Sequence, residues 1–199
     1  MKQEERRQQT VRRLLDTTKE LIQEKGCNSI TMQDIVSRSG LSKGAIFHYV
    51  KSKNEIFVWV LQERLEETNE KFMNAVEHGR RTFDEPMQKI QESIIAYENP
   101  HDVTNQVLMY LLGREEDPIV AEALKQYYDR SVQLSRIWIE TGQKHGVIPE
   151  TVNANKTADM FTLMTFGLRI RSSIPHTQAS FTANDLSAFI RDLLHQGSS

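Results

Sequence analysis

One stretch near the start of the chain decides its fold: Thr31-Met32-Gln33-Asp34-Ile35-Val36-Ser37-Arg38-Ser39-Gly40-Leu41-Ser42-Lys43-Gly44-Ala45-Ile46-Phe47-His48-Tyr49-Val50. Thr31 is followed three residues later by Asp34, a variant of the capping-box pattern that marks the start of a helix. Gly40 can adopt the left-handed conformation that ends a helix, and Ser42 can cap a second one. The stretch therefore predicts two short helices joined by a turn of helix-turn-helix length.

The second of these helices has an inward and an outward face. Ile46 and Val50 are four residues apart and are expected to face a core. Gly44 and Ala45 are small, so a DNA backbone can approach the helix closely, and its first N–H groups together with Lys43 offer positive potential to a phosphate. This composition favours a helix that enters the major groove of DNA. An ordinary two-helix corner has the same turn signals and stays open as the alternative.

Beyond this stretch, almost every apolar set falls on a helical period and strand signals are nearly absent. Leu14, Leu21 and Ile22 belong to the stripe of a first helix that Gly26 ends. Leu186 and Ile190 mark the last helix in the same way. We predict an all-α fold of about nine helices, near residues 4–25, 32–39, 43–49, 53–79, 84–98, 101–113, 118–145, 154–173 and 183–196.

The charge is distributed unevenly along the chain. Residues 1–53 carry 11 Lys and Arg against 6 Asp and Glu, a net charge of +5, whereas the whole chain has a net charge of −2. A basic N-terminal block on an acidic body is typical of a small head that binds a polyanion. Chance unevenness of solvated faces is the alternative.

Several classes of function lack their signals in this sequence. No apolar run is long enough to span a membrane, and the charged start is unlike a secretory signal, so we expect a cytoplasmic protein without membrane contact. Cys27 is the single cysteine and cannot form an internal disulfide. The motifs of common hydrolases, zinc proteases, phosphate-binding loops and dinucleotide sites are missing. The six histidines include no pair at helical spacing for a metal. We therefore expect no enzyme, catalytic residue, metal or cofactor.

The helix-turn-helix stretch resembles the DNA-binding domain of the tetracycline-repressor (TetR) family. The similarity is strong over about residues 10–57 and weaker beyond. Two departures concern the second helix, where Phe47 stands at a position that is usually Tyr and Val50 at one that is usually Phe. Two more concern the first helix, where Val36 and Ser39 replace alanine. The positions that match the family pattern are Thr31, Asp34, Ile35, Gly40, Leu41, Ser42, Lys43, Gly44, Ile46, Tyr49, Ser52 and Lys53.

The resemblance implies roles for individual residues and a division of the chain. Residues 1–53 would form the DNA-binding domain, and residues 54–199 a helical domain for dimerisation and ligand binding. Lys53 would contact a phosphate at the start of the fourth helix. The residues expected to lie at the DNA are Thr31, Gln33, Ser42, Lys43, Gly44, Ala45, Phe47, His48, Tyr49 and Lys53.

The resemblance also implies a homodimer, which the two-fold docking of such heads on DNA requires. Residues 157–168 are apolar nearly all round, as expected of a helix that is buried on more than one side. We therefore expect a dimer through residues 154–173 and 183–196, a four-helix bundle across the two-fold axis. An ordinary core helix within a monomer is the alternative.

A small-molecule effector is the last expectation that the resemblance carries. Methionine and aromatic residues suit an adaptable apolar pocket, although most such residues in any protein are simply core. The candidate pocket residues are Tyr97, Met109, Tyr110, Tyr127, Trp138, Phe161, Met164 and Phe166. We expect a small, largely apolar or cationic ligand, with Glu98, Asp102, Glu115 and Glu140 as carboxylates that could neutralise a cation or as ordinary solvated groups.

Taken together, the sequence predicts a DNA-binding transcriptional regulator that an effector releases from a palindromic double-stranded operator, and the resemblance favours a repressor. The alternative is a helical dimeric module that binds protein and not DNA. Salt-sensitive binding to a duplex distinguishes the two.

Overall fold

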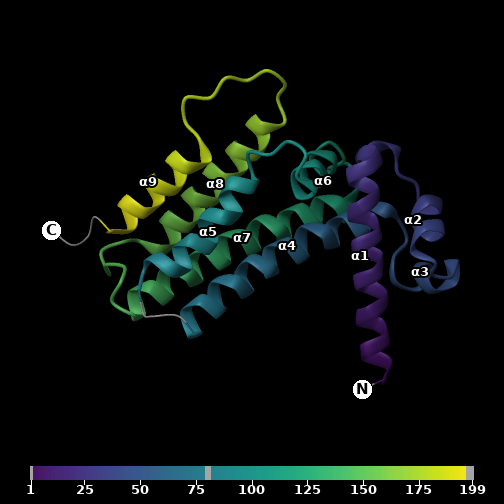
Figure 1. The fold of residues 1–199 in the computed structure, drawn as a ribbon, viewed down its shortest axis with the longest axis horizontal. Helices are drawn as coiled ribbons and strands as arrows, with labels where there is room; N and C mark the ends of the chain where they lie inside the picture. The colour runs from purple at the N-terminus through teal and green to yellow at the C-terminus, as the bar shows by residue number, and fades with distance from the viewer. Residues whose placement is uncertain (1, 79–81, 196–199) are drawn as a thin grey trace. The chain divides into compact units, whose positions relative to one another are not determined.

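The computed structural model describes residues 2–78 and 82–195, and the regular structure in these ranges is entirely helical. This confirms the predicted all-α fold. Residues 79 and 196, the expected ends of two helices, lie outside the described residues. The helices of the described ranges (Figure 1) are α1 (Lys2–Ser29), α2 (Met32–Ser39), α3 (Lys43–Tyr49), α4 (Lys53–His78), α5 (Asp84–Ala96), α6 (Val103–Leu112), α7 (Pro118–Lys144), α8 (Ala154–Ser172) and α9 (Ala183–His195).

The chain divides into two compact units. Unit 1 comprises Met1–Glu63 and Val103–Lys125, and unit 2 comprises Arg64–Asp102 and Gln126–Ser199. Two helices, α4 and α7, contribute residues to both units. These units are defined by packing, whereas the expected boundary after residue 53 separates two functions and stays a prediction.

Unit 1 is built on α1, which packs against α2 and α6. The apolar stripe of α1 forms its core side, with Leu14, Leu21 and Ile22 fully buried. Gly26 has a φ of 71° and a ψ of 158°, so the regular geometry of α1 breaks at the predicted residue. The few residues that follow lead the chain to the cap of α2.

Unit 2 has its core among α5, α7, α8 and α9, where α8 and α9 run side by side (Figure 1). Apolar residues at helical spacing on each helix bury one face, as the sequence pattern predicts. The buried members of this core cluster include Met87, Ile94, Ile139, Phe161, Leu168, Leu186, Ile190 and Leu194. No helix in the described ranges has the length and apolar character needed to cross a bilayer.

Candidate nucleic-acid interface

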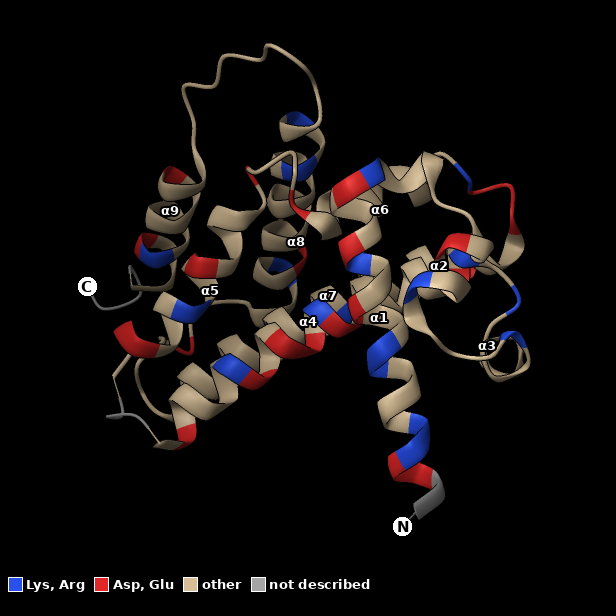
Figure 2. Cartoon of the chain, turned by 45° about the vertical axis from the view of Figure 1, so that its right-hand side comes forward, with Lys and Arg blue, Asp and Glu red and all other residues tan. Residues whose placement is uncertain are grey.

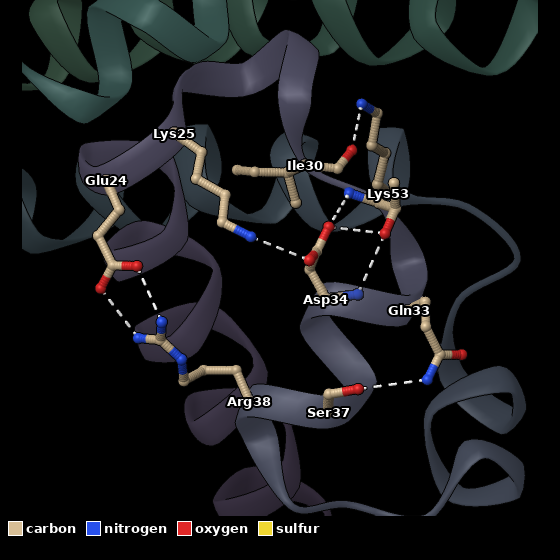
Figure 3. A network of polar contacts seen from close by, with 9 residues as sticks. Glu24, Lys25, Ile30, Gln33, Asp34, Ser37, Arg38 and Lys53 are labelled. Atoms are coloured by element: carbon tan, nitrogen blue, oxygen red, sulfur yellow. Dashed lines mark hydrogen bonds and ion pairs between the residues drawn. The ribbon is translucent and has the colours of Figure 1, made fainter.

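A reciprocal set of hydrogen bonds fixes the start of α2 (Figure 3). The Thr31 hydroxyl oxygen accepts a bond from the backbone N–H of Asp34 at 3.1 Å, and the Asp34 carboxylate accepts one from the Thr31 N–H at 2.9 Å. The Thr31 hydroxyl also donates to the same carboxylate at 2.7 Å. The capping box expected from the sequence is thus present with Asp in the position of Glu. This cap sets where α2 begins relative to the end of α1.

Two ion pairs tie α2 to α1, as the close view in Figure 3 shows. The Lys25 ammonium lies 3.0 Å from an Asp34 oxygen, and the Arg38 guanidinium donates to both oxygens of Glu24 at 2.9 and 2.8 Å. The bonds from Arg38 lower the pKa of Glu24. Lys25 and Arg38 therefore serve the packing of the domain, so only part of the basic N-terminal block is available for a polyanion.

The turn between α2 and α3 depends on Gly40 and on a residue that sequence reasoning passed over. Gly40 has a φ of 63°, the left-handed region that side chains disfavour. Ser39 is fully buried, and its hydroxyl donates to the Val36 carbonyl and accepts from the Leu41 N–H. Its departure from the alanine of the family pattern was the available signal. The buried hydroxyl thus links the last turn of α2 to the residue after Gly40, which stabilises the turn between α2 and α3.

Helix α3 has one buried edge and one open face. Its cap, Ser42, accepts a bond from the Ala45 N–H at 3.1 Å, and Ile46 is fully buried, as predicted. Lys43, Gly44 and His48 are exposed, and a Cβ added to Gly44 would have no heavy atom within 4 Å. The open face of α3 is therefore free of contacts from the described residues of its own unit around Gly44.

The remaining α3 candidates differ in exposure. The Phe47 ring is 41% exposed, and the Lys43 ammonium lies 5.7 Å from its centre. Tyr49 is half-buried and meets the His48 ring edge-on, with the ring centres 5.1 Å apart. An exposed large aromatic ring next to a lysine offers an apolar and a charged contact together, which suits the edge of a DNA groove. Figure 2 shows further Lys and Arg positions on α1, α2 and α3.

At the start of α2, Thr31 and Gln33 are both exposed, but both already have internal partners. Thr31 is engaged in the cap, and the Gln33 amide donates to the Ser37 hydroxyl at 3.2 Å. The Gln33 bond is a single exposed contact between neighbouring turns of one helix, so it can exchange for another partner at little cost. The DNA contacts expected for both residues stay predictions.

Lys53 lies differently from what the sequence led us to expect. Its ammonium donates to the carbonyls of Cys27 at 3.0 Å and Ile30 at 2.7 Å, and it lies 5.1 Å from the centre of the Tyr110 ring. The lysine thus satisfies two carbonyls where α1 ends and stacks on an aromatic ring. In this arrangement Lys53 stabilises unit 1, because its ammonium is hydrogen-bonded to two backbone carbonyls at the end of α1.

The capping carboxylate makes the stability of unit 1 depend on pH. The hydrogen bonds from the Thr31 side chain and backbone, with a further one from Lys25, hold the pKa of Asp34 well below its usual range. A carboxyl with a depressed pKa stabilises the fold above its unfolded pKa of about 4, and this contribution is lost as the pH falls toward the folded value. We expect Asp34→Asn to lower the Tm at neutral pH.

The melting temperatures of the wild type and Asp34→Asn, measured by circular dichroism, should converge as the pH is lowered from neutral to about 3. Glu70→Gln, on an exposed position of α4, is the matched control. Its difference in Tm from the wild type should stay the same over this pH range. A difference in Tm that stays constant across the range would contradict the role of the ionised carboxylate.

A separate cavity lies wholly within unit 2, with a volume of about 120 Å³ open to the centres of water molecules. This is several times the ~10–15 Å³ that a single water needs. Five of the eight candidate pocket residues line it: Tyr97, Tyr127, Trp138, Phe161 and Phe166.

The other three candidates lie elsewhere. Met109 and Tyr110 are on α6 in unit 1, where the Tyr110 ring packs edge-on against Phe57. Met164 packs against the core cluster of unit 2. Helical spacing could not distinguish Met109 and Tyr110 from pocket liners, because α6 packs against α1, which is distant in sequence.

Cys27 and the metal-binding side chains offer no reactive centre in the described ranges. Burial raises the pKa of the Cys27 thiol to about 11, which leaves little thiolate at neutral pH. Within residues 2–78 and 82–195, no group of three or more His, Cys, Asp or Glu side chains is placed to hold a metal ion.

Comparison with known sequences identifies the same segment of the chain. Residues 14–59 match the family described as bacterial regulatory proteins, tetR family. The uncharacterized HTH-type transcriptional regulator YfiR of Bacillus subtilis (strain 168) is 32% identical over 65 residues, which are 33% of this chain and 32% of that protein. The match thus spans about a third of either protein and coincides with the helix-turn-helix region.

Solved structures extend the similarity in fold to nearly the whole chain. Salmonella enterica GusR is 22% identical with a TM-score of 0.64, over 93% of this chain and 95% of that one. A putative transcriptional regulator from Saccharomonospora viridis in complex with choline is 21% identical with the same TM-score and coverage. A putative TetR-family regulator from Syntrophomonas wolfei is 17% identical with a TM-score of 0.68, over 96% and 94%. At these identities the similarity establishes the fold.

Proposed function

We propose that the chain is a homodimeric transcriptional regulator of the tetR family of bacterial regulatory proteins, which residues 14–59 match, and that it binds a palindromic operator. The observation that carries this proposal is the open face of α3. Ile46 anchors the helix, while Lys43, Gly44 and His48 lie exposed on a short helix that is capped at Ser42 and follows a tight turn. Such a helix can enter the major groove, with Lys43 and His48 close to phosphates and base edges.

The exposed apolar face of α8 and α9 supports the proposal that the partner is a second copy of the chain. Leu163, Gly167 and Ile170 on α8 are all exposed and repeat at intervals of four and three residues, and the exposed Ile174 follows the end of the helix. This spacing is that of a helix-packing seam in a four-helix bundle. Phe189 on α9 is 39% exposed and adds to the apolar surface. Gly167 has no heavy atom near its absent Cβ, so its lack of a side chain suits the close approach of a second helix.

The cavity in unit 2 supports control by a small molecule. Its lining is mostly apolar and aromatic, as in ligand sites generally. The Saccharomonospora viridis relative was crystallised with choline, so a chain of this fold has taken up a small organic molecule. We propose that an effector favours a conformation of the dimer with lower affinity for the operator, which is a population shift. Repression released by the effector is the mode of regulation that we propose, in the bacterial cytoplasm and without a catalytic step.

The test is binding of the purified full chain to DNA that flanks its own gene, measured by fluorescence anisotropy at several salt concentrations. We expect saturable binding to one palindromic segment, with an affinity that falls steeply as salt increases because phosphate contacts release counterions. A scrambled duplex of equal length should bind more weakly. Absence of binding to any duplex at low salt would overturn the proposal and favour a helical module that recognises protein.

A further inference from the structure

The cavity of unit 2 contains a buried arginine whose hydrogen-bonding groups the described residues satisfy only in part. Arg169 on α8 lines the cavity and is 2% exposed. Its Nη1 atom is buried and has no hydrogen-bond partner. An arginine stays charged in a protein interior, and a buried charge without an acceptor is costly. A ligand can therefore supply the hydrogen-bond acceptor that the Nη1 atom of Arg169 lacks.

The neighbours of Arg169 hold its guanidinium in place without neutralising it. The guanidinium carbon lies 3.8 Å from the centre of the Tyr97 ring and 5.9 Å from that of Tyr127. Stacking on Tyr97 uses the face of the guanidinium, and hydrogen bonds to the Tyr97 and Tyr127 side chains engage part of its N–H edge, while Nη1 has no partner among the described residues. Aromatic faces attract a cation but supply no formal negative charge.

The rest of the cavity wall points to the same ligand chemistry. Among the described lining residues there is no aspartate or glutamate, and Arg169 is the one permanently charged side chain among them. The hydroxyls of Ser131, Thr162 and Thr165 donate to backbone carbonyls of their own helices. Arg169 is therefore the strongest donor that the cavity can direct to a ligand.

The carboxylates expected to neutralise a cation do not belong to this cavity. Glu98 is paired with Arg171 at 2.7 Å, and Glu140 lies 3.6 Å from Arg136. Glu115 lies in unit 1, and Asp102 is not among the lining residues. The four carboxylates therefore do not line the cavity themselves, although Asp102 acts electrostatically on Tyr127 in its wall.

We propose that the effector is an amphipathic organic carboxylate, with its carboxylate on Arg169 and its apolar body along the aromatic and aliphatic wall. This inference rests on the proposed function, since it names the class of molecule that the regulator senses. The Nη1 atom has almost no accessible surface. The carboxylate therefore reaches it as the side chains at the inner wall adjust during binding. Planar carboxylates match the donor geometry of arginine better than spherical anions do.

The test is direct binding to the full chain without DNA, by isothermal titration with octanoate, octanamide and octylammonium, and with the aromatic pair naphthoate and naphthamide. A hydrogen bond to a charged group is worth about 1.5–3 kcal/mol, so a carboxylate should bind at least about tenfold more tightly than its amide. Arg169→Met should remove this preference, whereas Arg169→Lys should keep part of it. Arg191→Met, the same change at an exposed position of α9 outside the cavity lining, should leave the preference unchanged.

A thermal melt separates ligand recognition from a structural role of Arg169. Replacing a buried charge by an apolar side chain of similar length is often neutral or stabilising, so Arg169→Met should keep or raise the Tm without ligand. Octanoate should raise the Tm of the wild type and not that of Arg169→Met. A large loss of Tm in Arg169→Met, no binding of any carboxylate, or equal binding of amides and carboxylates would each overturn the inference. Because no DNA is present, these results are independent of whether the protein binds an operator.

Discussion

Replacing Gly44 by glutamate is expected to lower the affinity for operator DNA about a hundredfold while leaving the protein folded. Gly44 lies on the open face of α3, and a side chain added there meets no heavy atom within 4 Å. A carboxylate at this position faces phosphates and base edges instead of the positive potential that Lys43 provides. A loss of about 1.4 kcal/mol in each subunit is tenfold in affinity, and two subunits contribute. Fluorescence anisotropy with the operator duplex measures the effect.

Two variants separate the charge of the new side chain from its size and from general repulsion. Gly44→Gln adds a side chain of the same shape without the charge, so it should lose less affinity than Gly44→Glu, and the gap should narrow at high salt. Gln23→Glu adds the same charge on an exposed position of α1 and should change binding little. All three variants should melt close to the wild type. Unchanged operator binding by Gly44→Glu would show that α3 does not face the DNA.

The helix-turn-helix was predictable because its signals are local. The cap at Thr31, the left-handed Gly40 and the cap at Ser42 each act over three or four residues, and each is present in the structure as the sequence indicated. The break at Gly26 follows from the same kind of signal. Such residues need no knowledge of distant contacts, since backbone geometry and nearby hydrogen bonds decide their conformation.

The contacts of site residues that sequence reasoning did not foresee join distant parts of the chain. Lys53 bonds to the carbonyls of Cys27 and Ile30, and Tyr110 on α6 packs edge-on against Phe57 on α4 within unit 1. No local pattern indicates that a lysine at the start of a helix will turn inward to another helix end. The family resemblance placed Lys53 at a phosphate, and the packing of unit 1 gives it another partner.

Arg169 was missed for a related reason. The apolar run 157–168 predicts a buried helix, and the arginine that follows it reads as a solvated residue of the last turns. Tyr97, which caps the end of α5, and Tyr127 on α7 lie beside it, and this arrangement is visible only once α5, α7 and α8 are assembled. Arginine is rarely buried without a paired acceptor, so no pattern in the sequence places it at a pocket.

The second large effect is expected from the exposed face of α8. Changing Leu163 and Ile170 together to glutamate should convert the dimer into a monomer. These side chains are 57% and 46% exposed in the single chain, so the substitutions cost the monomer fold little. In the dimer each carboxylate would be buried near its counterpart from the second copy, which is strongly unfavourable. Light scattering coupled to size-exclusion chromatography measures the mass, and circular dichroism verifies that the helical content is retained.

The same double variant should also bind the palindromic operator more weakly by about a hundredfold or more. A dimer binds its second half-site at the high effective concentration that the first sets, and a monomer loses this gain of about 10²–10⁴. Binding to a single half-site should be nearly unchanged, because α3 is intact. Ile119→Glu is the matched control, since Ile119 is 54% exposed on α7 within unit 1 and should leave both mass and affinity unaltered. If the double variant Leu163→Glu and Ile170→Glu stays dimeric, the two copies meet through another surface, and the exposed face of α8 is not the dimer interface.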